Sequence, residues 1–210
     1  MMNTATSFIR VEDPVPAEVI EQIQNLDNDA LIIRLMFTIN HLSRWLTPIH
    51  DDDKLDRAVY RGEPTAKELV IRLREYDEMI YPRMFLISQQ PGADLDVLDD
   101  PRLSRPDVEF DRRDTTVVLM ARFRRIRQTI TSLLRTLPDD AWDLRGRSRK
   151  GIEGSIRSMA EALAIHDYRV LRALDQTLNQ TGARVGLAEI QKAPLDELLK
   201  LVPEHVDISE

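Results

Sequence analysis

The chain contains no cysteine, which excludes disulfide bonds, thiolate metal ligands and a cysteine nucleophile. Aromatic residues make up only 5% of the sequence, and only 7 of the 210 residues are glycine. Sheet proteins are usually richer in both, so this composition argues against a β-rich fold. No apolar run approaches the roughly 18 residues of a membrane span, and the N-terminus lacks an apolar signal core. We therefore expect a cytoplasmic protein with no membrane partner.

Basic residues are fewer than acidic ones: the chain has 29 Lys and Arg and 36 Asp and Glu, which gives a net charge of −7. Nucleic-acid binding needs a positive surface, so we expect no nucleic-acid partner. Residues 102–150 are the exception, with 13 basic and 7 acidic residues. This asymmetry either steers a small anionic ligand and guides self-association, or reflects the solvated face of an arginine-rich helix.

Four segments carry apolar residues at alternating spacings of three and four, the period of an amphipathic helix. These apolar stripes run over residues 32–46, 69–87, 119–137 and 156–173. A capping box of Thr65 and Glu68 marks the start of the second helix. Shorter helices are expected at about 16–26 and 195–201. The pattern predicts an all-α fold built as a four-helix bundle.

The domain organisation follows from the same stripes. We expect an N-terminal extension with a short helix over residues 1–27, the bundle over 28–180, and a C-terminal tail over 181–210 with one short docked helix. The connections at 47–64 and 88–113 are long for a simple bundle, so at least one crossover connection is expected.

Two stretches carry a family resemblance. The first is Gly62-Glu63-Pro64-Thr65-Ala66-Lys67-Glu68-Leu69-Val70, followed by Arg72-Leu73 and Asp77; the second is Phe123-x-x-x-Arg127, then Trp142, then Ala164-Ile165-His166-Asp167. Over about residues 28–180 the chain resembles the DinB/YfiT-like family. The resemblance implies an up-down-down-up four-helix bundle, often a homodimer, in which three histidines bind nickel or zinc. Relatives include mycothiol-dependent isomerases and bacillithiol transferases.

The ligand set that the resemblance implies is degenerate here. Where the family's second helix has a histidine before a leucine, this chain has Arg72 before Leu73. Where the fourth helix has His-Asp-x-x-His-Leu, this chain keeps His166 but has Val170 in place of the second histidine. Catalytic zinc sites normally use three protein ligands. We therefore expect no metal at the family position and no other bound cofactor.

Four residues are candidates for a ligand-binding site. His166 is expected to point into the bundle, either as a hydrogen-bonded core histidine or as an acid–base group in a retained pocket. Arg72 is expected either to pair with a core carboxylate such as Asp77 or to bind an anionic ligand. Arg127 matches a family position and is expected to pack inward against an acidic partner. His41 and His50 are the only other histidines placed to rebuild a metal site with His166.

Two functions remain open. The first is a non-catalytic module that has lost the family metal site and binds a small molecule or a partner. The alternative is a thiol-dependent transferase or isomerase that uses the bundle pocket around His166 and a low-molecular-weight thiol.

Overall fold

The computed structural model describes residues 9–99, 111, 113–149 and 154–200, and in this part the chain is helical. The bundle consists of α2 (Asn28–Leu46), α4 (Ala66–Gln89), α6 (Thr116–Thr136) and α7 (Ile156–Gln180). Short helices add α1 (Ala17–Gln24), α3 (Asp52–Leu55) and α8 (Leu195–Lys200), with 3-10 turns η1 (Leu95–Asp99), η2 (Asp139–Asp143) and η3 (Glu189–Gln191). The described residues contain isolated β-bridges but no strand. The all-α prediction is confirmed.

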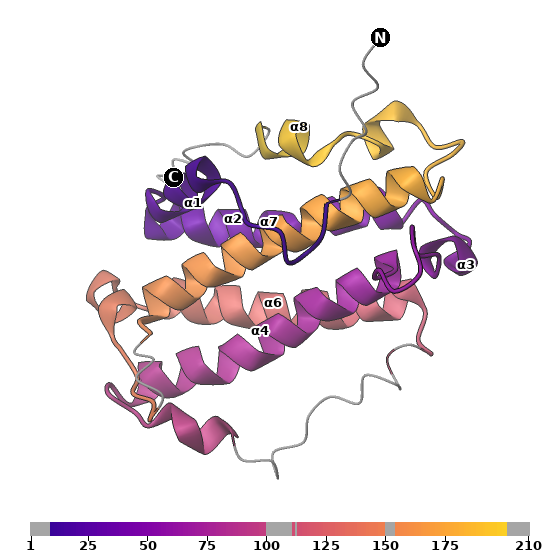
Figure 1. The fold of residues 1–210 in the computed structure, drawn as a ribbon. Coiled ribbons are helices and arrows are strands. Elements are labelled where there is room, and N and C mark those ends of the chain that lie inside the picture. Colours follow the sequence, from indigo (N-terminus) through magenta and orange to yellow (C-terminus); the bar gives the residue numbers. More distant parts are fainter. Residues whose placement is uncertain (1–8, 100–110, 112, 150–153, 201–210) are drawn as a thin grey trace.

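The four long helices run up, down, down and up (Figure 1). Arg157 donates to Asn28 at 2.9 Å, which brings the starts of α2 and α7 together. Asp52 accepts a hydrogen bond from the backbone of Thr116 at 3.1 Å and pairs with Lys67 at 3.6 Å, which brings the starts of α4 and α6 together at the opposite end. Helix α2 packs against α6 and α7, and α4 does the same, so α2 and α4 lie on one diagonal of the bundle. The connection at 47–64 therefore spans this diagonal, and the connection at 88–113 joins the parallel neighbours α4 and α6, which is the expected crossover.

Local sequence signals fix the helix starts. Thr65 accepts a hydrogen bond from the backbone of Glu68, and the Glu68 carboxylate accepts one from the backbone of Thr65, which completes the predicted capping box. Helices α1 and α8 lie close to the predicted positions. No helix in the described ranges is both long enough and apolar enough to cross a membrane.

Two clusters of buried apolar side chains fill the bundle, one around Trp45, Leu69 and Leu174 and the other around Leu35, Met84 and Leu163. Most residues of the predicted stripes are buried in these two clusters. The stripe on α6 differs from the prediction, because Arg127 and Leu134 are buried while Ile126 and Leu133 are only half-buried. The hydrophobic pattern missed a charged residue at the centre of the core.

Arg127 is fully buried and joins all four long helices. Its guanidinium donates to Asp77 of α4 at 2.8 and 2.7 Å and to Asp167 of α7, with one of the Asp167 bonds at 2.8 Å. It also donates to the carbonyl of Leu35 in α2 at 3.1 Å. Thr38 of α2 donates to Asp167 at 2.7 Å. We call Arg127, Asp77, Asp167 and Thr38 the central cluster. The expectation that Arg127 packs against an acidic partner is confirmed.

Every hydrogen-bond donor of Arg127 in the central cluster has an acceptor. A guanidinium has five N–H donors, and those of Arg127 meet carboxylate or carbonyl oxygens in five hydrogen bonds. Phe123 also presents its ring to the guanidinium carbon at 5.0 Å. Burial lowers the pKa of Arg127, but the two carboxylates outweigh this effect and raise it. Burial raises the pKa of Asp77 to about 6 even beside the guanidinium. The cluster is therefore a structural core element.

His41 lies in the core of α2, 4% exposed, between Phe37 and Trp45 at ring-centroid distances of 6.2 and 6.3 Å. Its Nε2 atom has no hydrogen-bond partner among the described residues. Burial, aided by the charges of Arg34 and Arg44, lowers the pKa of His41 to about 4. His41 is therefore a neutral core histidine.

Replacing Arg127 by methionine should lower the free energy of unfolding by about 3–5 kcal/mol, because two buried carboxylates lose their counter-charge. Urea denaturation followed by circular dichroism measures the change. The matched control is Arg125→Met, an exposed arginine on the same helix, which should stay within about 0.5 kcal/mol of the wild type. Adding Asp77→Asn and Asp167→Asn to the Arg127 variant should recover part of the loss. An Arg127 variant as stable as the Arg125 control would contradict the assignment.

Acid should destabilise the protein through His41. Its pKa is lower in the folded state than the ordinary value of 6.5, so the unfolded chain binds the extra proton and stability is lost as the pH falls from about 6.5 towards 4. The raised pKa of Asp77 acts in the opposite direction over a similar range. Comparison with His41→Phe isolates the histidine term, which should reach up to about 3 kcal/mol. A His41→Phe profile parallel to that of the wild type would refute the assignment.

Candidate functional site

His166 lies between α7 and α4 and does not point into the centre of the bundle. Its ring stacks on Tyr76 of α4, with centroids 4.1 Å apart and planes 23° apart. The next residue, Asp167, takes the central position and contacts Arg127. Adjacent helical residues point about 100° apart, so only one of the two can face the centre. His166 therefore faces α4 within the bundle and lies beside the central cluster rather than in it.

The environment of His166 keeps it neutral. Burial lowers its pKa, while the charge of Asp167 and a hydrogen bond to the backbone of Arg72 oppose the shift. Its Nε2 atom is buried and has no hydrogen-bond partner in the described part of the chain. The ring is thus held in place by stacking rather than by a full set of polar contacts.

Arg72 does not pair with Asp77. Positions five apart on a helix point about 140° apart, so Asp77 faces the centre while Arg72 faces outward. The Arg72 side chain is 40% exposed and donates to Glu12 of the N-terminal segment at 3.1 Å. The predicted Arg72–Asp77 pair is wrong, and the partner of Asp77 is Arg127.

The N-terminal segment was not predicted to contribute here. Val11 and Val15 are buried, and the Ile9 backbone donates to Gln176 of α7 at 2.5 Å. Arg10 pairs with Glu63, just before α4, at 2.9 Å. We call residues 9–15 the N-terminal strap, since they connect α7 to α4 and to the loop before it. The valines were the only sequence signal for its docking.

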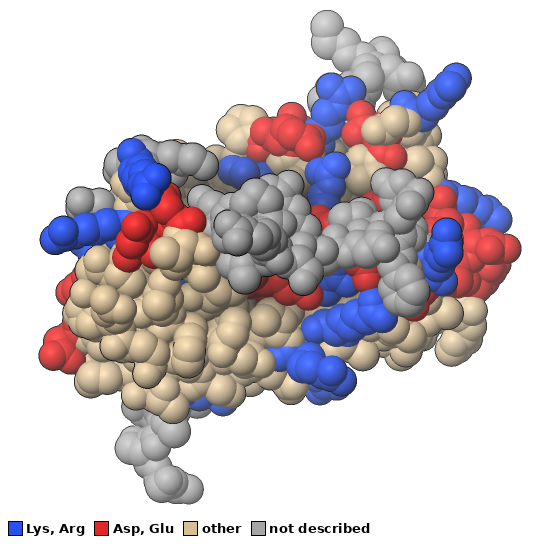
Figure 2. All heavy atoms as spheres, turned by 90° about the horizontal axis from the view of Figure 1, so that it is seen from below, with Lys and Arg blue, Asp and Glu red and all other residues tan. Residues whose placement is uncertain are grey.

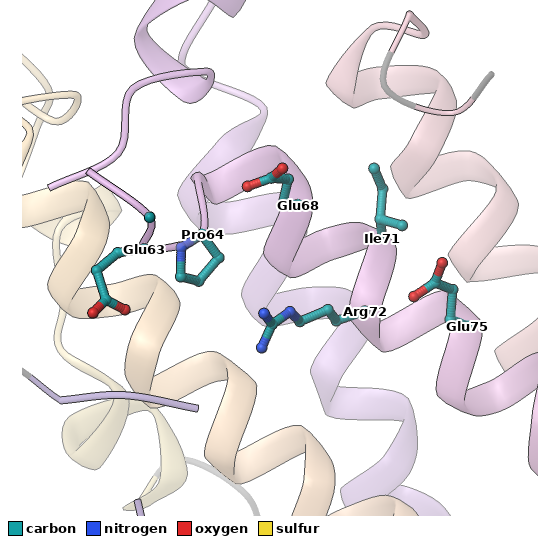
Figure 3. Close-up of a pocket in the computed structure, with 7 residues that line it drawn as sticks. Glu63, Pro64, Glu68, Ile71, Arg72 and Glu75 are labelled. Carbon is teal, nitrogen blue, oxygen red and sulfur yellow. The ribbon is translucent and has the colours of Figure 1, made fainter. Parts of the chain in front are cut away.

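A pocket of about 400 Å³ lies beside Arg72, at the start of α4. Figure 3 shows Arg72 reaching towards Pro64, with Glu63 beyond it and Glu75 further along α4. Seven residues form the lining: Gly62, Glu63, Pro64, Glu68, Ile71, Arg72 and Glu75. Three carboxylates and one guanidinium therefore surround this space. Of the predicted site residues, only Arg72 belongs to this lining.

The residues at the three family ligand positions do not fit a metal ion. Arg72 is a cation engaged with Glu12, Val170 is fully buried and has no lone pair, and His166 is stacked on Tyr76. Among the described residues, no three His, Asp or Glu side chains come together in a group able to hold a metal. Neither His41 nor His50 therefore joins His166 in such a group.

Charge is mixed on the surface seen from below. Figure 2 shows Lys and Arg beside Asp and Glu over the right of the view, and a broad uncharged area at the lower left. In the stretch expected to be basic, Arg122 pairs with Asp111 and Asp114 at 2.7 and 2.6 Å. Part of the excess positive charge is thus neutralised locally; residues 102–110, 112 and 150 of this stretch lie outside the described residues.

Comparison with protein-family models and with curated protein sequences gives no match. Among solved structures, the chain is similar to YfiT from Bacillus subtilis, with a TM-score of 0.57 and 16% sequence identity over 84% of this chain and 93% of that one. YfiT is described as a probable metal-dependent hydrolase with an unusual four-helix bundle topology. At this identity the likeness concerns the fold. The chain therefore has a YfiT-type, up-down-down-up four-helix bundle.

Proposed function

We propose that this chain is a non-catalytic, small-molecule-binding module that keeps the YfiT-type bundle but works without a metal. The observation that carries the proposal is the side-chain content of positions 72, 166 and 170. One is a cation paired with Glu12, one is a stacked neutral imidazole, and one is a buried valine. A lone imidazole is a poor binder of a labile divalent ion, because water competes for the remaining positions.

The contacts at the centre of the bundle support the same view. Arg127 and its carboxylates connect the helices there through hydrogen bonds, so these contacts do not need a metal ion. The pocket beside Arg72 offers room for a small molecule, since ligand pockets usually begin at a few hundred Å³. The hydrogen-bond donors of Arg127 are satisfied within the protein, and the pocket is lined by other charged residues. A small molecule can therefore bind in the pocket without disturbing the core.

The thiol-dependent enzyme is the weaker candidate. It needs His166 as an acid or base, but the Nε2 atom is buried and the ring is covered by Tyr76. It also needs a cation to hold an anionic thiol cofactor, and Arg72 is the one cationic residue among the described residues that line the pocket. Three carboxylates line the same pocket and repel an anion.

Elemental analysis tests the proposal. The untagged protein, incubated with excess nickel or zinc and then dialysed, should hold far less than one metal ion per chain, and His166→Ala should not change that value. His50→Ala, at an exposed histidine, is the matched control for surface binding. Close to one metal per chain, lost in the His166 variant and kept in the His50 variant, would refute metal-independent function.

A further inference from the structure

The pocket beside Arg72 has charges of both signs, and the chain's own N-terminal strap engages one of each. Arg72 and Glu63 both line the pocket. The strap places Glu12 on Arg72 at 3.1 Å and Arg10 on Glu63 at 2.9 Å. One short segment thus offers a carboxylate to the pocket's cation and a guanidinium to one of its anions.

The two strap residues are close together. They lie two positions apart, so their backbones are at most about 7 Å from each other. Their partners, Arg72 and Glu63, line one pocket, so a single small molecule that carries both charges can reach both partners. The pocket volume of about 400 Å³ accommodates such a small molecule.

The remaining lining charges disfavour a ligand that carries negative charge alone. Glu68 and Glu75 add two carboxylates to Glu63, against one guanidinium. The Glu68 carboxylate is partly used by the backbone of Thr65, at 3.0 Å. A ligand with negative charge alone would meet this carboxylate excess, which disfavours the purely anionic ligand expected from the sequence.

The charges of a ligand can readily replace Glu12 and Arg10 in the strap's two ion pairs. Glu12 and Arg10 are 71% and 62% exposed in their side chains, and exposed ion pairs contribute little because water and salt screen them. The strap is anchored separately, by buried Val11 and Val15. A ligand can therefore take over both ion pairs without undocking the strap.

We propose that the pocket at the start of α4 binds a zwitterionic small molecule, whose carboxylate replaces Glu12 on Arg72 and whose amine or guanidinium replaces Arg10 on Glu63. This inference rests on the proposed binding function and names its ligand class. The strap charges act as an internal competitor for the same positions.

Three matched probes separate the two charges. Nα-acetyl-L-arginine carries a carboxylate and a guanidinium, N-acetylagmatine lacks the carboxylate, and N-acetyl-norvaline lacks the guanidinium. Calorimetric titration should show binding of acetyl-arginine, with each of the other two about tenfold weaker or more. Equal binding of N-acetylagmatine or N-acetyl-norvaline would overturn the requirement for both charges.

Variants locate the site and test the competition. Arg10→Ala with Glu12→Ala removes the strap charges and should tighten acetyl-arginine binding about two- to thirtyfold, since two exposed ion pairs no longer compete. Glu63→Gln or Arg72→Gln should abolish that gain, whereas Arg61→Gln, an exposed neighbour outside the lining, should not. Amide chemical shifts at Gly62 and Ile71 give a second readout in the wild type.

The proposal is overturned if neither the wild type nor the strap variant binds acetyl-arginine at millimolar concentration, or if binding ignores both Glu63→Gln and Arg72→Gln. These outcomes are distinct from a failure of metal-independent function, which depends on metal content and His166. Acetyl-arginine binding in a protein that also holds stoichiometric metal would uphold the ligand class and refute metal independence.

Discussion

One buried cluster of charges holds this bundle together. Arg127 sits where the four long helices meet, and its five donors bind Asp77, Asp167 and the Leu35 carbonyl. Removing Arg127 leaves two carboxylates in the core without a counter-charge, which is far more costly than the pairing is stabilising. The cluster therefore fixes which faces of α4 and α7 turn inward, and it sets which residues on these helices face away from the centre.

The site follows from that constraint. Because Asp167 turns inward, His166 turns towards α4 and stacks on Tyr76. Because Asp77 turns inward, Arg72 turns outward to Glu12 and lines the pocket. The positions that the family resemblance assigns to a metal thus lie outside the central cluster, and of these only Arg72 lines the pocket. In this chain they carry a neutral ring, a paired cation and an aliphatic side chain.

The sequence predicted the helices well, because their apolar stripes and the capping box are local signals. It predicted the side-chain partners of the candidate residues less well, for a physical reason. A stripe of period 3.6 defines a face about 100° wide, and neighbouring positions such as His166 and Asp167 both fall near it. Choosing between them requires knowing that Arg127 stands opposite, which is a tertiary fact. The i, i+4 spacing of Arg72 and Tyr76 indicated that both lie on the same face of α4. No local pattern in the sequence predicted that Glu12 would form an ion pair with Arg72.

The most direct test of the account is anomalous diffraction from crystals grown in excess nickel or zinc. The account predicts that no anomalous peak lies within coordination distance of the Nε2 atom of His166, that the ring remains stacked on Tyr76, and that Arg127 still binds both carboxylates. A metal peak on His166, with Tyr76 displaced and further ligands drawn in, would contradict it.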